Sequence, residues 1–136
     1  CLSLLGTWSG AKGETWDPAV STTLQVIVSV QSLILCPRPY FNEPGFEKSA
    51  GTEEGERRSA EYDDVITEHT LRYAMLEMVK KPPEGFEEAV REHFRRRRGR
   101  ILGPVKDAWL KAKTSAESRK RAEGLFAELE KELNAL

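Results

Sequence analysis

The segment from Leu24 to Leu35 constrains the fold most, because it is apolar over most of its length yet interrupted by polar residues. Its β-branched residues alone would favour a strand. The polar side chains recur at spacings of three and four residues, which draws one stripe along a helix. They are Thr22, Gln25, Ser29, Ser32 and Cys36. A helix that is apolar around the rest of its surface has to be buried on several sides.

The sequence also marks the ends of this helix. Asp17 suits the cap, and Pro18 suits the first helical turn. Pro37 closes the far end, because a proline restricts the residue before it. We therefore expect one helix that starts at Pro18 and ends before Pro37.

The next stretch, Pro37 to Arg58, keeps no helical or strand period and is rich in Pro, Gly, Glu, Asn and Ser, which predicts a long loop. Loops of this length are usually functional or disordered. Tyr40, Phe41 and Phe46 favour packing in its first half. We expect weak order from Lys48 to Arg58.

Amphipathic patterns predict the remaining helices. One helix is expected from Ser59 to Lys80. Its core face repeats every three or four residues and consists of Tyr62, Val65, Ile66, His69, Tyr73 and Leu76. We interpret His69 as a packing residue of that face.

Three further elements are expected after Lys80. A short helix has an apolar side made of Phe86, Ala89, Val90, His93 and Phe94, and it ends in an arginine run capped by Gly99. After Gly103-Pro104, a second short helix collects Val105, Ala108, Trp109 and Ala112 on one side.

A capping box at Thr114-Ser115-Ala116-Glu117 predicts the start of the last helix. The apolar stripe of that helix either docks within the chain or seats a partner helix. It consists of Ala122, Leu125, Phe126, Leu129, Leu133 and Leu136. The predicted fold class is mainly α, with four to five helices.

Composition excludes several classes of function. The 21 basic and 22 acidic side chains give a net charge of −1, so no global field directs the chain to nucleic acid or to an anionic membrane. The longest apolar stretch is about half a membrane-spanning length. Two cysteines do not make a disulfide framework, and we expect both thiols to be reduced. No metal-ligand spacing or phosphate-binding glycine loop appears, so we expect no cofactor and no metal.

The run Arg95 to Arg98, with Arg100, is the one local departure from charge balance. Cations at the negative end of a helix dipole explain it in structural terms. A docking patch for an acidic partner, or a nuclear-import signal, is the alternative. Nucleic acid binding ranks lower, because no aromatic platform interleaves with these charges.

Two motifs carry a resemblance to a known family. The first runs from Cys1-Leu2-Ser3-Leu4-Leu5 through Trp8 and Trp16-Asp17-Pro18 into the apolar helix. It resembles the segment that leads from the catalytic cysteine of ubiquitin-conjugating enzymes into their second helix. The second, Tyr40 to Glu47, is similar to the active-site loop of the very large hybrid conjugating enzyme/ligase type, including the type that carries a baculovirus-type inhibitor repeat. The resemblance covers roughly Cys1 to Trp109.

The resemblance implies an acyl transfer. Cys1 would be the catalytic nucleophile that accepts ubiquitin as a thioester and passes it to a lysine amine or a ligase. The active-site loop would consist of Tyr40, Asn42, Glu43, Pro44 and Gly45, with the asparagine and the glutamate shaping the approach of the lysine. The implied partners are ubiquitin, the ubiquitin-activating enzyme, a ligase and protein substrates. Neither nucleic acid nor a membrane is implied, and we expect a cytoplasmic monomer, with the nucleus as the alternative location.

The resemblance also bears on what is missing. In the family, an N-terminal helix, an antiparallel sheet and a His-Pro-Asn signature precede the catalytic cysteine. We therefore expect residues 1–98 to be the C-terminal part of an α+β catalytic domain, and residues 99–136 to be a helical extension. The asparagine of that signature is assigned the stabilisation of the oxyanion, so we expect the isolated chain to be inactive or limited to one turnover.

One consequence concerns the α-amine of Cys1. If the molecule begins at this residue, an amine with a pKa of about 7.7–8.0 lies beside the thioester sulfur. Transfer of the acyl group from sulfur to nitrogen would then trap ubiquitin as an amide. The alternative function, from a different class, is a catalytically incompetent helical interaction module derived from such a domain.

Overall fold

The computed structural model describes residues 3–7, 9–11 and 13–136, and their regular secondary structure is entirely helical. This confirms the predicted mainly α class. The contacts divide the chain into two compact units, Cys1–Ser59 and Ala60–Leu136. No helix in the described ranges combines the length and the apolarity that crossing a bilayer needs.

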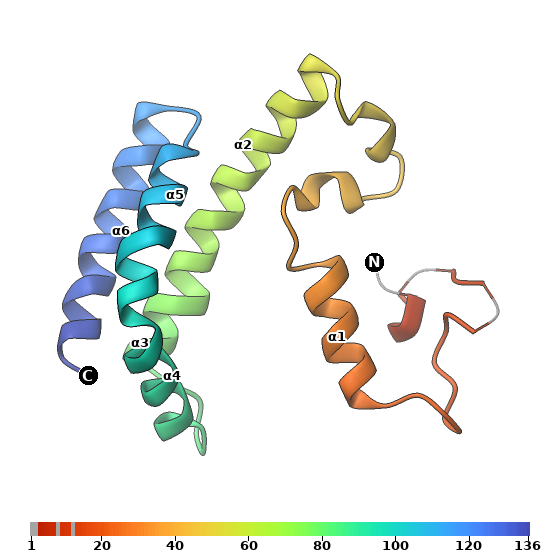
Figure 1. The fold of residues 1–136 in the computed structure, drawn as a ribbon, viewed down its shortest axis with the longest axis horizontal. Helices are drawn as coiled ribbons and strands as arrows, with labels where there is room; N and C mark the ends of the chain where they lie inside the picture. The colour runs from red at the N-terminus through yellow and green to blue at the C-terminus, as the bar shows by residue number, and fades with distance from the viewer. Residues whose placement is uncertain (1–2, 8, 12) are drawn as a thin grey trace. The chain divides into compact units, whose positions relative to one another are not determined.

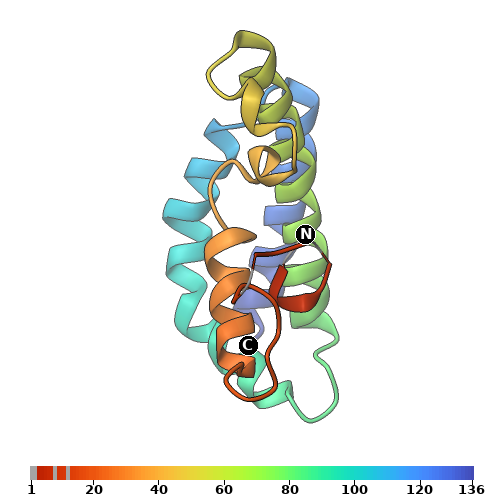
Figure 2. The same ribbon diagram turned by 90° about the vertical axis from the view of Figure 1, so that its right-hand side faces the viewer.

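Three helical rods build the second unit, and the first of them begins in the first unit (Figure 1). That rod comprises α2 (Glu53–His69), a π-helical stretch η4 (Thr70–Glu77) and α3 (Met78–Lys80). The second comprises α4 (Glu87–Arg100), a π-helical stretch η5 (Ile101–Val105) and α5 (Lys106–Lys111). The third is α6 (Ala116–Asn134). Figure 2 shows α6 lying alongside both of the other rods, which agrees with its contacts to η4, α4 and α5.

The hydrophobic core of the described residues lies wholly within the second unit. Its ten buried members are Leu71, Leu76, Val79, Phe94, Ile101, Ala122, Leu125, Phe126, Leu129 and Leu133. Phe126, Leu71 and Leu129 are fully buried. Burial of each large side chain contributes about 1.5–3 kcal/mol. The apolar stripe of α6 therefore docks within the chain, which resolves one of the alternatives left open by the sequence.

The predicted core face of the helix from Ser59 to Lys80 is largely wrong. Tyr62, Val65 and Tyr73 are 41%, 52% and 54% exposed. The buried positions include Leu71 and Leu76, which are five residues apart. In a π-helix the i→i+5 repeat brings such a pair to one side, so a pattern read with the α-helical period misses this face.

A buried polar cluster explains the rest of that error. The carboxylate of Asp64 lies 3.4 Å from the ammonium group of Lys113, and their side chains are only 9% and 2% exposed. The backbone N–H and the hydroxyl of Thr114 donate to the other carboxylate oxygen at 3.1 and 2.5 Å. Burial by itself raises the pKa of Asp64, but these hydrogen bonds, one from Ser118 and the charge of Lys113 together lower it. A polar residue thus occupies the buried face because its partners come from the α5–α6 connection.

The arginine run does not end a helix at Gly99, contrary to the prediction. The helix continues through Gly99 into η5, and its backbone leaves helical values only at Gly103, with φ −105° and ψ −106°, just before Pro104. Proline at that position lacks an N–H donor, so it favours a kink there.

The start of α6 also differs in detail from the prediction. Ser115, one residue after the predicted cap, accepts a hydrogen bond of 3.1 Å from the backbone N–H of Ser118. Thr114 is instead committed to Asp64. The buried carboxylate competes successfully for the threonine, so the predicted box with Glu117 does not form.

The first unit contains α1 (Thr23–Leu33). It begins later than predicted, because Thr22 and Gln25 form a reciprocal capping box. Asp17 caps a turn instead, where its carboxylate accepts from the backbone N–H of Ala19.

The apolar surface of α1, which the resemblance leads us to expect against the sheet of the family's fold, is exposed. No residue of this helix is buried, and Leu24 and Ile27 are 68% and 58% exposed.

Candidate active-site loop

The predicted nucleophile, Cys1, lies outside the described residues, as does Trp8 of the same motif. The predicted loop from Tyr40 to Gly45 is described. It includes a 3-10 turn, η2 (Pro39–Asn42), and a second one, η3 (Glu47–Ser49), follows it. The geometry of the candidate site is therefore that of this loop and of its attachments to α1 and α2.

Asn42 attaches the loop to the C-terminal end of α1. Its side-chain amide donates at 2.6 Å to the carbonyl oxygen of Leu33, the last residue of the helix. The same amide donates at 3.0 Å to Sγ of Cys36. The last carbonyls of a helix lack intrahelical partners, so this contact satisfies a group that the helix leaves open. The amide nitrogen of Asn42 is thus committed to positioning the loop.

Aromatic side chains close the loop on itself. The ring of Tyr40 stacks on that of Phe46, with 4.7 Å between centroids, and meets the edge of Phe41 at 5.3 Å. Such pairs add about 0.5–1.5 kcal/mol beyond the burial of area. The predicted packing of Tyr40, Phe41 and Phe46 in the first half of the loop is confirmed.

Arg38 joins the loop to the start of α2. Its φ of 54° is in the left-handed region, which is uncommon for a residue other than glycine. The guanidinium group donates to both carboxylate oxygens of Glu56 at 3.0 Å and lies 5.2 Å from the centroid of Phe41. These two contacts hold the strained backbone conformation in place.

Glu56 is held from a second side. The backbone N–H of Gly51 donates to its carboxylate at 2.9 Å, and this bond, followed by the one from Arg38, lowers the pKa of Glu56. The carboxylate is thus ionised when it binds the guanidinium group.

Helix α2 begins at Glu53, so the loop predicted to extend to Arg58 is shorter than expected. The hydroxyl of Thr52 accepts from the backbone N–H of Gly55 at 3.0 Å, as an N-cap does. Glu54 pairs with Arg57 and Arg58 one turn later. A Cβ on Gly55 would lie 2.0 Å from the carbonyl oxygen of Ser49, so only glycine permits this close approach.

The three remaining predicted residues form the exposed tip of the loop. Gly45 has a φ of 95°, and its N–H donates to the carboxylate of Glu47 at 2.5 Å. Pro44 and Glu43 are exposed. Within the described ranges, no hydrogen bond or ion pair engages the Glu43 carboxylate. An exposed carboxylate on a fixed turn can attract and orient a cationic group from solvent.

The structure adds Arg38, Glu56 and Cys36 to the residues that shape this loop. The arginine and the glutamate are eighteen positions apart, which matches no local spacing rule. The described residues contain no group of three or more His, Cys, Asp or Glu that could hold a metal ion.

Several known proteins are similar in sequence to this chain. No known protein-family profile matches the chain. A probable ubiquitin-conjugating enzyme E2 of Acanthamoeba polyphaga mimivirus is 49% identical over 94 residues, which cover 69% of this chain and 6% of the relative. A probable ubiquitin-conjugating enzyme E2 of Arabidopsis thaliana is 46% identical over 114 residues, or 82% of this chain and 10% of the relative.

The chain belongs to the ubiquitin-conjugating enzyme family. Within this family it resembles the human dual E2 ubiquitin-conjugating enzyme/E3 ubiquitin-protein ligase BIRC6, with 47% identity over 110 residues, which are 81% of this chain and 2% of that protein. The predicted resemblance to the family and the predicted resemblance to its large hybrid conjugating enzyme/ligase type are both confirmed. The chain spans 2–10% of the length of these three curated relatives.

Proposed function

We propose that this chain carries the catalytic-cysteine part of a ubiquitin-conjugating domain, in which Cys1 accepts ubiquitin as a thioester and passes it to a lysine amine or to a ligase. The observation that carries the proposal is the 46–49% identity, over 69–82% of the chain, to proteins named as conjugating enzymes. Residues 1–98 would form the family part, and residues 99–136 a helical extension.

The first step exchanges one thioester for another. The Cys1 thiolate attacks the ubiquitin carbonyl carbon held on a cysteine of the activating enzyme, and the enzyme's thiolate leaves as the new carbon–sulfur bond forms. Because the bond formed and the bond broken are of the same kind, the exchange is close to isoenergetic. The nucleophile in this step is the thiolate of Cys1, because a neutral thiol attacks a carbonyl carbon far more slowly.

The second step is chemically harder. A neutral lysine amine attacks the same carbonyl, a tetrahedral oxyanion forms, the Cys1 thiolate leaves and the nitrogen loses a proton. A single donor to such an oxyanion contributes about 2.7–4 kcal/mol. In the family, the asparagine of the His-Pro-Asn signature has that role.

The loop would serve the arriving lysine. The free, exposed carboxylate of Glu43 supports a role in attracting the ammonium group and in accepting its proton. The amide of Asn42 is engaged at the end of α1, which favours a role in fixing the loop. Tyr40, Pro44 and Gly45 would set the shape of the turn that carries the glutamate.

The partners in this proposal are ubiquitin, the activating enzyme, a ligase and protein substrates. The protein would act as a monomer in the cytoplasm or the nucleus, without binding nucleic acid or a membrane. A net charge of −1 supports the exclusion of polyanionic surfaces.

A second function is favoured by one observation, the exposed apolar surface of α1. Leu24, Ile27 and Leu33 are 68%, 58% and 54% exposed. Such a surface suits a binding module without activity. The two functions differ in whether Cys1 ever carries ubiquitin.

A discharge assay tests the proposed role of the loop. The chain would be extended at its N-terminus by the family's sheet and His-Pro-Asn segment, charged with ubiquitin, and mixed with free lysine. We expect Glu43→Gln to slow discharge about tenfold, at the low end of what local charge contributes to encounter rates. Glu53→Gln, at the exposed start of α2, is the matched control. Equal rates for the two variants would remove Glu43 from the proposal.

A further inference from the structure

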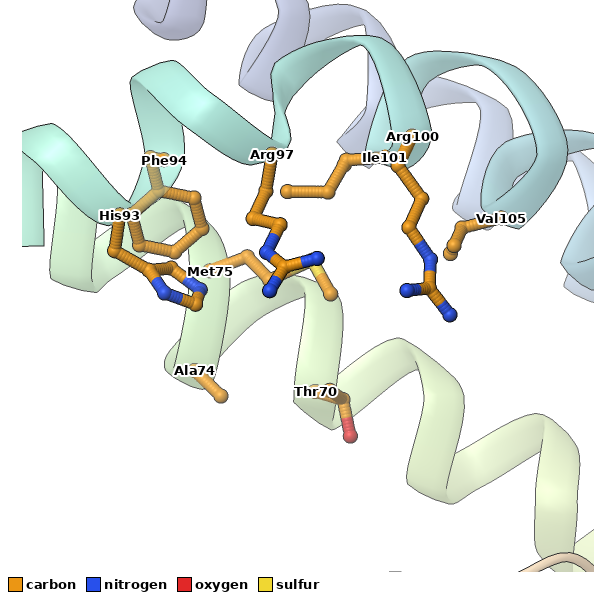
Figure 3. A pocket seen from close by; sticks show the side chains of 9 residues that line it. All are labelled: Thr70, Ala74, Met75, His93, Phe94, Arg97, Arg100, Ile101 and Val105. Carbon is orange, nitrogen blue, oxygen red and sulfur yellow. The ribbon is translucent and has the colours of Figure 1, made fainter.

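A pocket of about 360 Å³ lies between η4 and the α4–η5 segment of the second unit (Figure 3). Thr70, Ala74 and Met75 line it from η4. This volume falls within the range of about 300–1,000 Å³ that is typical of ligand sites. The pocket lies outside the active-site loop and has no role in the proposed transfer.

The arginines around this pocket divide into two groups. Arg95 and Arg96 pair with Glu92 at 2.8 and 2.5 Å, and Arg95 also donates to the carbonyl oxygen of Leu136 at 3.2 Å. Arg98 donates to the side-chain oxygen of Asn134. These three guanidinium groups are therefore occupied by the protein itself.

Arg97 and Arg100 behave differently. Both line the pocket, and Figure 3 shows their guanidinium groups extending from the α4 helix in the direction of η4. Being three residues apart, they share one side of the helix. No acidic residue lines the pocket, and among the described residues neither guanidinium group has a hydrogen-bond or ion-pair partner. Two positive charges on one side of a pocket repel each other, and a bound anion would offset this repulsion.

The inner surface of the pocket is apolar. Phe94 and Ile101, each 6% exposed, form part of it, and Val105 extends it along η5. His93 lies at the rim, with its ring edge-on to Phe94 at 5.3 Å. The hydroxyl of Thr70 already donates to the carbonyl oxygen of Ile66 at 2.8 Å, so it does not supply the donors for a ligand.

We propose that this pocket binds an acidic segment of a partner protein, with one apolar side chain inserted against Phe94 and Ile101 and flanking carboxylates paired with Arg97 and Arg100. We assign carboxylates to the partner segment because guanidinium groups bind carboxylates with matched geometry. We assign an apolar side chain between the carboxylates because the interior of the pocket is apolar. A free phosphate has no such apolar group. Nucleic acid is a poorer fit, because Phe94 is the one Phe, Tyr or Trp side chain in the lining, and at 6% exposure it leaves an apolar contact but no open face on which a base could stack.

Fluorescence anisotropy on the full 136-residue chain tests this proposal without any activating enzyme, so it is independent of the proposed conjugation. The probe is a dye-labelled peptide with a Glu-Phe-Glu core in a Gly-Ser frame. The comparison peptides carry Gln-Phe-Gln, which removes the charges, and Glu-Gly-Glu, which removes the apolar side chain. We expect the Glu-Phe-Glu peptide to bind at least tenfold more tightly than either, or about 1.4 kcal/mol.

Matched variants separate the pocket from general charge. Arg97→Gln with Arg100→Gln removes the two unpaired guanidinium groups, and we expect it to abolish the tenfold preference. Arg95→Gln with Arg98→Gln changes the net charge equally but removes groups that the protein already occupies, so the preference remains. Ala74→Phe fills the pocket without changing any charge and abolishes binding. Circular dichroism confirms that each variant is folded.

The contrary results are equally definite. An equal loss in both double-arginine variants would mean that net charge alone drives binding, and the proposal would fail. Equal affinity for the three peptides, unchanged binding by Ala74→Phe, or no saturable binding of the Glu-Phe-Glu peptide would also overturn it.

Discussion

The side-chain amide of Asn42 donates a hydrogen bond of 2.6 Å to the carbonyl oxygen of Leu33, nine residues earlier in the chain. This contact connects the end of α1 to the candidate active-site loop. The same amide contacts Cys36, so one side chain fixes both the helix end and the position of a thiol.

Replacing Asn42 should therefore loosen the loop. In Asn42→Ala, loss of a hydrogen bond of about 0.5–1.5 kcal/mol raises the open population of the loop roughly two- to tenfold. With Cys1→Ser as the background, the Cys36 thiol should react correspondingly faster with a thiol reagent. Glu43→Ala, which removes an unpaired side chain from the same loop, should leave this rate unchanged. Equal rates for all three proteins would contradict the role given to Asn42.

The buried pair of Asp64 and Lys113 should be costly to break. In Asp64→Asn, the ammonium group of Lys113 loses its charge partner while it remains 2% exposed. Removing one member of a buried pair typically costs about 3–5 kcal/mol. Urea unfolding measures this change in the free energy of unfolding. The double variant Asp64→Leu with Lys113→Met should recover much of the loss, and a further loss in the double variant would argue against an unpaired charge as the cause.

The same pair should make stability depend on pH. The pKa of Asp64 is lowered in the folded protein from its ordinary value of about 3.9. A lowered folded-state pKa contributes stability that is present above the unfolded-state value and is lost as the pH falls through the folded-state value. The difference in unfolding free energy between the parent and Asp64→Asn should therefore shrink steadily below about pH 4. A difference that stays constant down to pH 2 would contradict the shift.

Truncating a side chain in the core of the second unit should cost far more stability than truncating one on the exposed surface of α1. Leu129 is fully buried, and Leu129→Ala should cost about 2–5 kcal/mol. Leu24 is 68% exposed, and Leu24→Ala should change the unfolding free energy by less than about 0.5 kcal/mol. Both values come from urea unfolding of the whole chain. A cost above 2 kcal/mol for Leu24→Ala would mean that α1 is packed against something.

Local patterns in the sequence predicted the helices better than their ends or faces. The stripe from Ala122 to Leu133 in α6 is regular, apolar and buried, so its period was sufficient to place it. The face of the helix through Tyr73 could not be read in this way. A π-helical stretch changed its register, and a polar residue, Asp64, took a core position whose partners lie about fifty residues away.

In the candidate site, too, local contacts could be predicted from the sequence, whereas contacts between distant residues could not. The aromatic residues of the loop predicted that it packs on itself, and Tyr40 does stack on Phe46. The contacts of Asn42 with Leu33 and of Arg38 with Glu56 depend on the path of the chain, which no local spacing encodes. The role of Cys1 came from family resemblance alone, and it stays a prediction.

A charging assay with activating enzyme, ATP and ubiquitin tests the central proposal most directly. It would use the chain extended by the family's sheet and His-Pro-Asn segment, together with its Cys1→Ser and Cys36→Ser variants. The proposal predicts an adduct of one ubiquitin that reductant removes, that Cys1→Ser lacks and that Cys36→Ser retains. An adduct that follows Cys36, or no adduct on the extended chain, would contradict conjugation through Cys1 and favour the binding module.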